Sequence, residues 1–600
     1  MIDASTSGAA DAKFARDGWI RALQRTASID EHPQRTLPVL IDELASEFGA
    51  SPALESREGS LSYAQLAARA HQYARWGLSQ GLVAGDVAAL LMPNCAEYVA
   101  VWLGLTRIGV TVALLNTHLV RDAQAHCIQI AAPKLLIASA GLAPTLEGLR
   151  PQLKPESERW VLGSGAQDLA LDPILAKPSA VPLAAHEYAA PTLDATALYI
   201  YTSGTTGLPK AAKVTHYRLL RWSLWFAGLM DTGPRDRMYN CLPLYHSVGG
   251  VVAVGAVLAG GGAVVIRPRF SASDFWRDVR DERCTLFQYI GELCRYLVNA
   301  PPQTAQIAHA LRLACGNGLR PEVWEIFKSR FRIPRILEYY ASTEGNFSLY
   351  NLEGRPGAIG RTPSFLAHRL PVALLRFDYD REEPIRNAEG FCERCAVDEA
   401  GEAVGLIADD ERGRAGRFEG YADARATERK VLRNVFKAGD AWYRTGDLMR
   451  RDAAGFYYFV DRIGDTFRWK GENVSTAEVM SALAAAPGVT EGVVYGVSVP
   501  GTDGRAGMAA LVVSGDFNIE AFRAAVAARL PAYARPVFLR LLPALEATGT
   551  FKPRKQELVA AGFDPAHIAD PLYFDDARAG LYLPIDAALH AEIMGGRVRV

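Results

Sequence analysis

The sequence has almost no net charge: 65 Lys and Arg residues stand against 66 Asp and Glu residues, which leaves a formal charge of −1. A dedicated nucleic-acid surface gives a basic excess, and a disordered acidic tail gives an acidic one. The balance argues against both and predicts no nucleic-acid partner. Any anionic ligand has to be held by a local group of cations and backbone amides.

An export signal and an uninterrupted membrane span are also missing. The first thirty residues lack a positive start, an apolar core and a small-residue cleavage site. The longest apolar run, 248–266, contains six glycines, three of them consecutive at 260–262, and predicts a turn between a buried helix and a buried strand. We expect a cytoplasmic protein, either free or held peripherally at the inner face of a membrane.

Residues 13–25, KFARDGWIRALQR, leave two alternatives open. Phe14, Trp19, Ile20 and Leu23 could form the apolar face of a helix that lies on an anionic bilayer, with basic residues along its rim. The same pattern is typical of a helix docked on its own domain.

Cysteine is sparse, with eight residues scattered along the chain. Such scatter in a long chain indicates reduced thiols rather than a disulfide framework. Only Cys392 and Cys395 form a CxxC pair. Because no second pair and no nearby histidine accompany it, we assign no metal there.

The chain is too long for one hydrophobic core, so several domains are expected. The apolar runs 87–92 and 110–116 flank a helical pattern at 97–109, a β-α-β order that predicts a parallel sheet and the α/β class. A section of short strands and turns over 371–420 predicts a small β-rich part.

After residue 455, strands and helices alternate over the length of a compact α+β domain. We therefore predict a large N-terminal domain of two α/β subdomains and a small β-rich section, followed by a small mobile α+β domain. The predicted segments are an N-terminal extension at 1–36, the large domain at 37–463 and the small domain at 464–600.

Residues 201–210, YTSGTTGLPK, give the strongest local signal. Glycines expose backbone N–H groups, the hydroxyl side chains add donors and Lys210 adds positive charge, which suits a phosphate-binding loop. The order differs from the P-loop GxxxxGK[ST], which runs directly into a helix. Here an apolar strand, ALYIY, enters the loop, and Pro209 followed by AAKV predicts a turn into a second strand.

This decamer resembles the ATP loop of the AMP-forming adenylating enzymes, the superfamily of acyl-CoA synthetases, luciferases and peptide-synthetase adenylation domains. Further segments are similar to motifs of that family, namely CGNGLR (315–320), EYYASTEGN (338–346), YRTGDL (443–448) and VDRIGD (460–465). The second of these departs from the family pattern, because Ala341 replaces the usual glycine.

The resemblance implies roles for the matching residues. Tyr340 would stack on adenine, Thr343 would meet phosphate and Glu344 would hold Mg²⁺. Asp447 would accept the ribose hydroxyls, with Arg462 beside it. The residues implied to bind ATP or AMP are Thr202, Ser203, Gly204, Thr205, Thr206, Gly207, Lys210, Asn317, Gly318, Tyr339, Tyr340, Ala341, Ser342, Thr343, Asp447 and Arg462.

Near the C-terminus, ATGTFKPRK places Lys552 at the position of the family's catalytic lysine, and the implied catalytic set is Lys552, Glu344, Thr202 and Lys210. The family's hinge position, usually Asp or Lys, is Gly464, and glycine crosses backbone conformations without a Cβ penalty. Rotation about this hinge would withdraw Lys552 and present Lys470, Gly471 and Glu472 to coenzyme A.

Within the superfamily, the sequence looks like the fatty-acid transport proteins, also called very-long-chain acyl-CoA synthetases. YNCLPLYHSVGG, RPRFSASDFW and DPLYFDDARAGLYLP carry this likeness. The N-terminal membrane segment of the animal members is not found here. The acyl pocket is expected at His246, Val248, Gly249 and Gly316, although His246 fits a core position equally well.

The implied activity is that of an AMP-forming ligase that uses ATP, Mg²⁺ and coenzyme A. It would convert a long- or very-long-chain fatty acid to an acyl-adenylate and then to acyl-CoA. One alternative of the same chemistry takes bile-acid, sterol side-chain or aryl carboxylates. Two further alternatives are a fatty-acid carrier without catalysis and an adenylation domain that loads a carrier protein. Acyl chain length and oligomeric state stay open.

Overall fold

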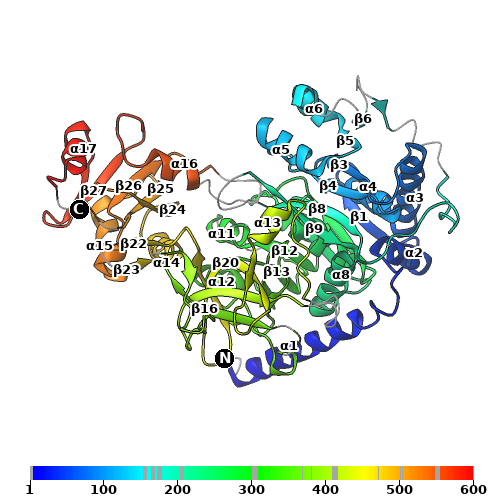
Figure 1. Ribbon diagram of the computed structural model, residues 1–600, viewed down its shortest axis with the longest axis horizontal. Coiled ribbons are helices and arrows are strands. Elements are labelled where there is room, and N and C mark those ends of the chain that lie inside the picture. Colours follow the sequence, from blue (N-terminus) through cyan, green and yellow to red (C-terminus); the bar gives the residue numbers. More distant parts are fainter. Residues whose placement is uncertain are drawn as a thin grey trace. The chain divides into compact units, whose positions relative to one another are not determined.

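The computed structural model describes residues 4–119, 121–152, 158–163, 169–171, 179–202, 208–300, 308–367, 369, 371–379, 381–408, 416–469, 472–500, 502, 504–546, 555–598 and 600. Two compact units are present (Figure 1). The large unit contains Met1–Pro371 and Leu406–Val431, and the small unit contains Val372–Gly405 and Leu432–Val600. Residues 372–405 of the predicted β-rich section thus fall with the small unit and the rest of it with the large unit. The functional boundary at 463/464 stays a prediction.

The first sheet of the large unit contains the predicted β-α-β order. β3 pairs in parallel with β4, and α4 (Ala96–Arg107) connects them. Apart from Thr111 these strands are apolar, because helices cover a parallel sheet on both faces. The strand order is β7 (Leu169–Ala170), β6 (Glu158–Leu162), β5 (Leu135–Ser139), β3 (Val87–Leu91), β4 (Thr111–Leu114), β8 (Thr196–Thr202) and β9 (Lys210–Thr215).

The second sheet has a parallel centre and an antiparallel strand at each edge. Its order is β15 (Ser348–Asn351), β14 (Ile336–Ala341), β13 (Leu313–Asn317), β12 (Leu286–Ile290), β10 (Arg237–Asn240), β11 (Ala263–Ile266), β1 (Pro52–Ser56) and β2 (Gly59–Ser62). Parallel strands end at one edge, so the segments that follow β13 and β14 lie together there.

Helices fill the connections of the large unit (Figure 1). They are α1 (Ala4–Thr26), α2 (Leu37–Phe48), α3 (Tyr63–Ser79), α4, α5 (Arg121–Ala131), α6 (Ala143–Leu149), α8 (His216–Met230), α9 (Val254–Leu258), α10 (Phe275–Asp281), α11 (Gly291–Asn299), α12 (Pro321–Arg330) and α13 (Ala424–Glu428).

The apolar run at 248–266 folds as a buried helix, a turn and a strand, as predicted. A π-helical turn, η3 (Ser247–Ala253), leads into α9, and Gly261 lies in the turn before β11 with φ +80°. No helix in the described ranges is both long and apolar enough to cross a membrane.

Helix α1 is docked on the large unit. Ala15, Trp19 and Ala22 are buried, and Phe14 and Leu23 pack against the same core. Of the apolar face considered for a bilayer, only Ile20 is substantially exposed, at 42%. The structure therefore shows the docked alternative.

The small unit contains a sheet with the path β17 (Glu383–Pro384), β16 (Val372–Asp378), β18 (Gly401–Leu406), β20 (Ala441–Arg451) and β19 (Val431–Arg433), and β21 (Tyr457–Arg462) also pairs with β20. A hairpin, β22 (Phe467–Trp469) with β23 (Glu472–Val474), precedes a five-stranded sheet of β24 (Val489–Val497), β25 (Ala506–Val513), β26 (Phe538–Leu542), β27 (Leu572–Asp576) and β28 (Leu581–Pro584). The helices are α14 (Thr476–Ala484), α15 (Ile519–Arg529), α16 (Lys555–Ala561) and α17 (Ala587–Met594).

Candidate functional site

The predicted phosphate loop connects the antiparallel strands β8 and β9. Thr202 and Lys210 are register partners at the loop end of this hairpin, so the loop begins and ends at one point. The predicted turn into a second strand is confirmed. The predicted ligands Ser203, Gly204, Thr205, Thr206 and Gly207 lie outside the described residues.

Tyr421 contacts Thr202 and Lys210, the residues on either side of the loop, and also Glu344. Its hydroxyl donates to Glu344 Oε1 at 2.8 Å and is hydrogen-bonded to the Thr202 hydroxyl, while Lys210 Nζ lies 5.6 Å from its ring centroid. Burial, reinforced by the Glu344 charge, raises the pKa of the Tyr421 phenol well above its usual value, so it remains a donor.

Sequence reasoning missed Tyr421, because no motif marks the segment around it. Backbone pairing brings it to the site: Tyr421 bridges Ala212 of β9, and Lys213 N donates to Gly420 O at 3.0 Å. The segment is added to the edge of the first sheet beside the loop. Its place at the site becomes visible only from the backbone pairing of Tyr421 with Ala212, which lies far away in the sequence.

Glu344 has the features of a single carboxylate ligand for Mg²⁺. The residue is 8% exposed, one of its oxygens accepts from Tyr421, and no described residue donates to the other. Mg²⁺ commonly binds through one or two carboxylates and completes its shell with substrate phosphates and water. The residues present therefore fit the ion implied by the sequence.

The segment after Tyr340 contacts the segment after His246. The Ser247 and Thr343 hydroxyls are 3.0 Å apart, and Arg218 Nη1 donates to the Thr343 carbonyl at 2.8 Å. These contacts bring the predicted phosphate ligand Thr343 next to the turn that carries His246.

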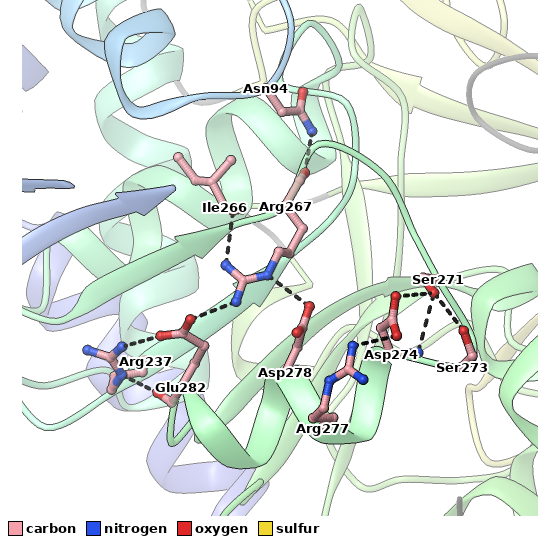
Figure 2. Close-up of polar contacts among 10 residues, drawn as sticks. All are labelled: Asn94, Arg237, Ile266, Arg267, Ser271, Ser273, Asp274, Arg277, Asp278 and Glu282. Atoms are coloured by element: carbon pink, nitrogen blue, oxygen red, sulfur yellow. Dashed lines mark hydrogen bonds and ion pairs between the residues drawn. The ribbon is translucent and has the colours of Figure 1, made fainter. Parts of the chain in front are cut away.

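A polar network fixes that turn, and Figure 2 shows the part of it around Arg267. Asn94 donates to the carbonyls of Leu242 at 2.8 Å and Arg267 at 3.1 Å, and it accepts from Leu244 N at 2.9 Å. Arg267 binds Asp278 and Glu282 at 2.9 and 2.7 Å, which holds the end of β11 against α10. The turn before His246 is thus built into the second sheet.

The ends of β13 and β14 lie side by side. Gly316 is the register partner of Glu338, which places Asn317 and Gly318 near Tyr340, Ala341 and Ser342. The Tyr340 side chain is half-buried. Tyr339 is only 2% exposed and packs against Phe226, so only its backbone could reach a nucleotide.

The buried carboxyl group of Glu338 stabilises the ends of β13 and β14. Glu338 accepts from Tyr289 Oη at 2.5 Å and from Leu319 N at 3.1 Å. Burial is the main cause that raises the pKa of Glu338 to about 8. The group thereby anchors the backbone that follows Asn317.

The predicted acyl-pocket glycines have a packing explanation. A Cβ on Gly249 would lie 2.6 Å from Pro243 O, and a Cβ on Gly316 would lie 2.2 Å from Tyr289 O. His246 is half-buried beside Tyr245, with ring centroids 4.6 Å apart. An acyl contact from His246, Val248, Gly249 or Gly316 stays a prediction.

A cavity lies instead between α8 and β15. Arg218, Arg221, Trp222 and Trp225 line it, and their helical spacing places them on one face of α8. Ser348 and Tyr350 of β15 form the facing wall.

The cavity is also lined by Gly345 and Glu419, which are close in sequence to Glu344 and Tyr421. Its volume is only about 50 Å³. The space is therefore narrow.

In the small unit, Asp447 and Arg462 form a cross-strand pair. They are register partners of β20 and β21, with Arg462 Nε 3.5 Å from Asp447 Oδ1. Thr445 Oγ1 accepts from Asp447 N at 3.0 Å and orients the backbone. The two predicted ribose contacts are thus brought together within this unit.

Gly464 follows β21 with φ +88°, and a Cβ there would meet nothing within 4 Å. Polar contacts connect the residues on its two sides. Asp461 accepts from Thr476 N at 2.6 Å, and Lys555 Nζ lies 3.2 Å from Asp465 and 3.1 Å from Thr476 Oγ1. Burial raises the pKa of Asp461.

The structure describes only one of the four remaining predicted residues. Lys552, Lys470 and Gly471 lie outside the described residues. Glu472 begins β23 and pairs with Trp469.

Comparison with known proteins settles the family. The family model for AMP-binding enzymes matches residues 41–368, and the family model for their C-terminal domain matches residues 478–552. Long-chain fatty acid transport protein 1 of Mus musculus is 40% identical over 570 residues, which cover 94% of this chain and 88% of that protein. The chain belongs to the AMP-binding enzymes.

Other relatives of this AMP-binding enzyme agree. Long-chain fatty acid transport protein 3 of Homo sapiens is 40% identical over 523 residues, or 86% of this chain and 76% of that protein. The sequence-based resemblance is therefore confirmed.

Solved structures show the same fold. The anthranilate CoA ligase AuaEII in complex with anthranoyl-AMP has a TM-score of 0.76 at 20% identity, covering 88% of this chain and 97% of that one. A Mycobacterium tuberculosis fatty acyl CoA synthetase has a TM-score of 0.61 at 23% identity, covering 88% and 98%. The predicted α/β fold of this AMP-binding enzyme is confirmed.

Proposed function

We propose that this AMP-binding enzyme is an ATP-dependent, AMP-forming ligase that joins a long- or very-long-chain fatty acid to coenzyme A. The observation that carries the proposal is the convergence of Thr202, Lys210, Glu344 and Tyr421 at the loop end of the β8–β9 hairpin. Identity with long-chain fatty acid transport protein 1 along most of the chain supports the acid class.

The chemistry explains the need for this cluster. A carboxylate is a poor acyl donor, because oxide would be its leaving group. In the first step a carboxylate oxygen attacks the α-phosphorus of ATP and the bond to pyrophosphate breaks, which gives an acyl-adenylate. Charge develops on the phosphate oxygens, so fixed donors and cations stabilise the transition state more than a general base would.

The residues at the hairpin have different roles in stabilising this charge. Lys210 and the Thr202 hydroxyl provide a cation and a donor where the loop closes. Glu344 would hold Mg²⁺, which when bound neutralises charge on the phosphates. Tyr421 orients the Glu344 carboxylate and shares its hydroxyl with Thr202.

We place the acid in the cavity between α8 and β15. Its walls include Gly345, next to Glu344, so a carboxylate at this end would lie near the phosphates while the chain extends along Trp222 and Trp225. The tryptophan rings would contact an apolar chain, and because the cavity holds only about 50 Å³, its walls have to move apart when a long chain enters.

In the second step the thiol of coenzyme A attacks the adenylate carbonyl and AMP leaves. Lys552 and the thiol would need the same approach, so rotation at Gly464 would withdraw the lysine after the first step. The conformation of Gly464 is compatible with this role, since its positive φ suits glycine and its surroundings are open.

The test is AMP release that depends on coenzyme A, measured with hexadecanoic, docosanoic, cholic and benzoic acids. We expect the fatty acids to give the highest kcat/KM. A higher value for cholic or benzoic acid would reassign the acid class. Absence of both AMP release and pyrophosphate–ATP exchange with every acid would reject the ligase and favour a carrier without catalysis. Glu344→Gln serves as the inactive control.

A further inference from the structure

Helix α1 lies outside the region matched by the family model, which begins at residue 41. It nevertheless packs closely along α8 (Figure 1). The contact is tight because Gly228 has no side chain: a Cβ there would lie 2.4 Å from the Ala22 Cα. The helix is therefore a fitted part of the large unit.

Trp19 is the aromatic centre of this contact. It is 4% exposed and meets Tyr350 edge-on at a centroid distance of 5.5 Å and Trp225 at 5.9 Å. Both partners line the cavity between α8 and β15. Trp19 thus stands directly behind one wall of the space in which we place the acid.

Two groups of the residues that line this cavity differ in their surroundings. Gly345 and Glu419 adjoin the Glu344–Tyr421 pair, whereas Trp225 and Tyr350 are backed by Trp19. A carboxylate bound near Glu344 would therefore extend its chain towards the Trp225–Tyr350 wall. Trp19 packs against both rings of that wall.

We propose that Trp19 fixes the depth of this cavity and with it the acid length that the enzyme prefers. The inference rests on the proposed function. Trp19 acts as a positioning residue, because it touches Trp225 and Tyr350 rather than the acid. A smaller side chain would let the two rings retreat and lengthen the space.

Other contacts keep α1 docked when Trp19 is changed. Arg21 Nε donates to Gly228 O at 3.1 Å and lies 3.2 Å from Asp231. Arg25 donates to the carbonyls of Thr232 at 3.0 Å and Ala259 at 3.3 Å. A Trp19 variant therefore changes the packing behind Trp225 and Tyr350 while α1 stays docked.

The experiment compares Trp19→Leu with Trp160→Leu. Trp160 is also 4% exposed and also meets an aromatic ring edge-on at 5.5 Å, that of Trp76, but neither residue lines the cavity. For hexadecanoic and docosanoic acids, kcat/KM comes from AMP release and Kd from equilibrium dialysis of the labelled acids. Unfolding temperatures are recorded for all proteins.

We expect Trp19→Leu to raise the docosanoic-to-hexadecanoic ratio of kcat/KM and of affinity, by about fourfold for each additional methylene that gains room. Trp160→Leu should lower the unfolding temperature and leave both ratios unchanged. If Trp19→Leu does not fold, Trp19→Phe should give a smaller shift in the same direction.

Unchanged ratios in the Trp19 variants, or equal shifts in the Trp160 control, would overturn the inference while leaving the ligase activity intact. A wild-type protein that neither binds nor turns over either acid would reject the proposed function and the inference together. Binding without turnover would reject only the ligase, because the Kd ratios still decide the role of Trp19.

Discussion

The two units hold their site residues differently. In the large unit, Glu344, Tyr421 and Thr202 form a chain of hydrogen bonds inside a buried hairpin edge, and a further network fixes the turn before His246. In the small unit, Asp447 and Arg462 form a loose pair near Gly464, whose flanking residues are joined by polar contacts.

The difference matches the two demands of the proposed reaction. Adenylate formation needs donors that are fixed before the substrates arrive, because reorganisation would cost part of the rate enhancement. Thioester formation needs a rearrangement, for which a flexible backbone position is more suitable than a packed one. Variants of the two regions should therefore affect different half-reactions.

The largest effect is expected from Lys552→Ala. Loss of a well-aimed cation should lower adenylate formation by about 10²–10³-fold while largely sparing conversion of preformed acyl-adenylate to thioester. Pyrophosphate–ATP exchange and thioester formation measure the two steps separately. Lys555→Ala is the matched control, because Lys555 contacts Asp465 and Thr476 and should not affect adenylation. Equal losses in both steps would exclude the catalytic role of Lys552.

Gly464→Pro should have the opposite effect, slowing thioester formation and largely sparing adenylation. Proline holds φ near −65°, whereas Gly464 has φ +88°, so the hinge conformation is lost. We expect thioester formation to fall by about tenfold or more and adenylation to change by only about threefold.

Gly464→Ala and Gly439→Ala control for the backbone cost in the Gly464 experiment, because both positions have positive φ and open surroundings. Only the former should slow the second step. Identical half-rates in all these variants would remove Gly464 from the hinge.

Tyr421→Phe should weaken adenylation moderately. It removes one hydrogen bond to the Glu344 carboxylate, which corresponds to about a tenfold loss in kcat/KM for ATP. Tyr201→Phe is the control, because its hydroxyl donates to Cys127 O at 2.6 Å in the same hairpin. If both variants lose the same activity, Tyr421 has only a structural role.

The smallest effect on catalysis, but a clear one on stability, is expected from Glu338→Gln. The pKa of Glu338 is raised to about 8 by burial, so the folded state binds the proton more tightly than the unfolded state. Wild-type stability should therefore decrease as pH rises from about 5 to about 8, by at most about 1.4 kcal/mol per pH unit from this group.

The Gln variant should lack this decrease, as measured by urea unfolding across that range. A parallel pH dependence in both proteins would contradict the assignment. Tyr289→Phe is a useful companion, because it removes the hydroxyl bonded to Glu338 at 2.5 Å without changing the number of carboxylates.

Local patterns predicted the local structure well. The β8–β9 hairpin and the β3-α4-β4 order follow from apolar periodicity and turn residues. Pairings between distant segments were not accessible in this way. Tyr421 reaches Glu344 through backbone pairing with β9, and Trp19 reaches Tyr350 through helix packing.

The chain leaves the large unit after Pro371 and returns to it at Leu406. A fragment that stops at residue 368, where the first family match ends, would retain Glu344 but lose the phenol that binds it. Domain-dissection and partial-proteolysis studies should therefore keep Leu406–Val431 attached, since the proposed nucleotide site would otherwise lack Tyr421.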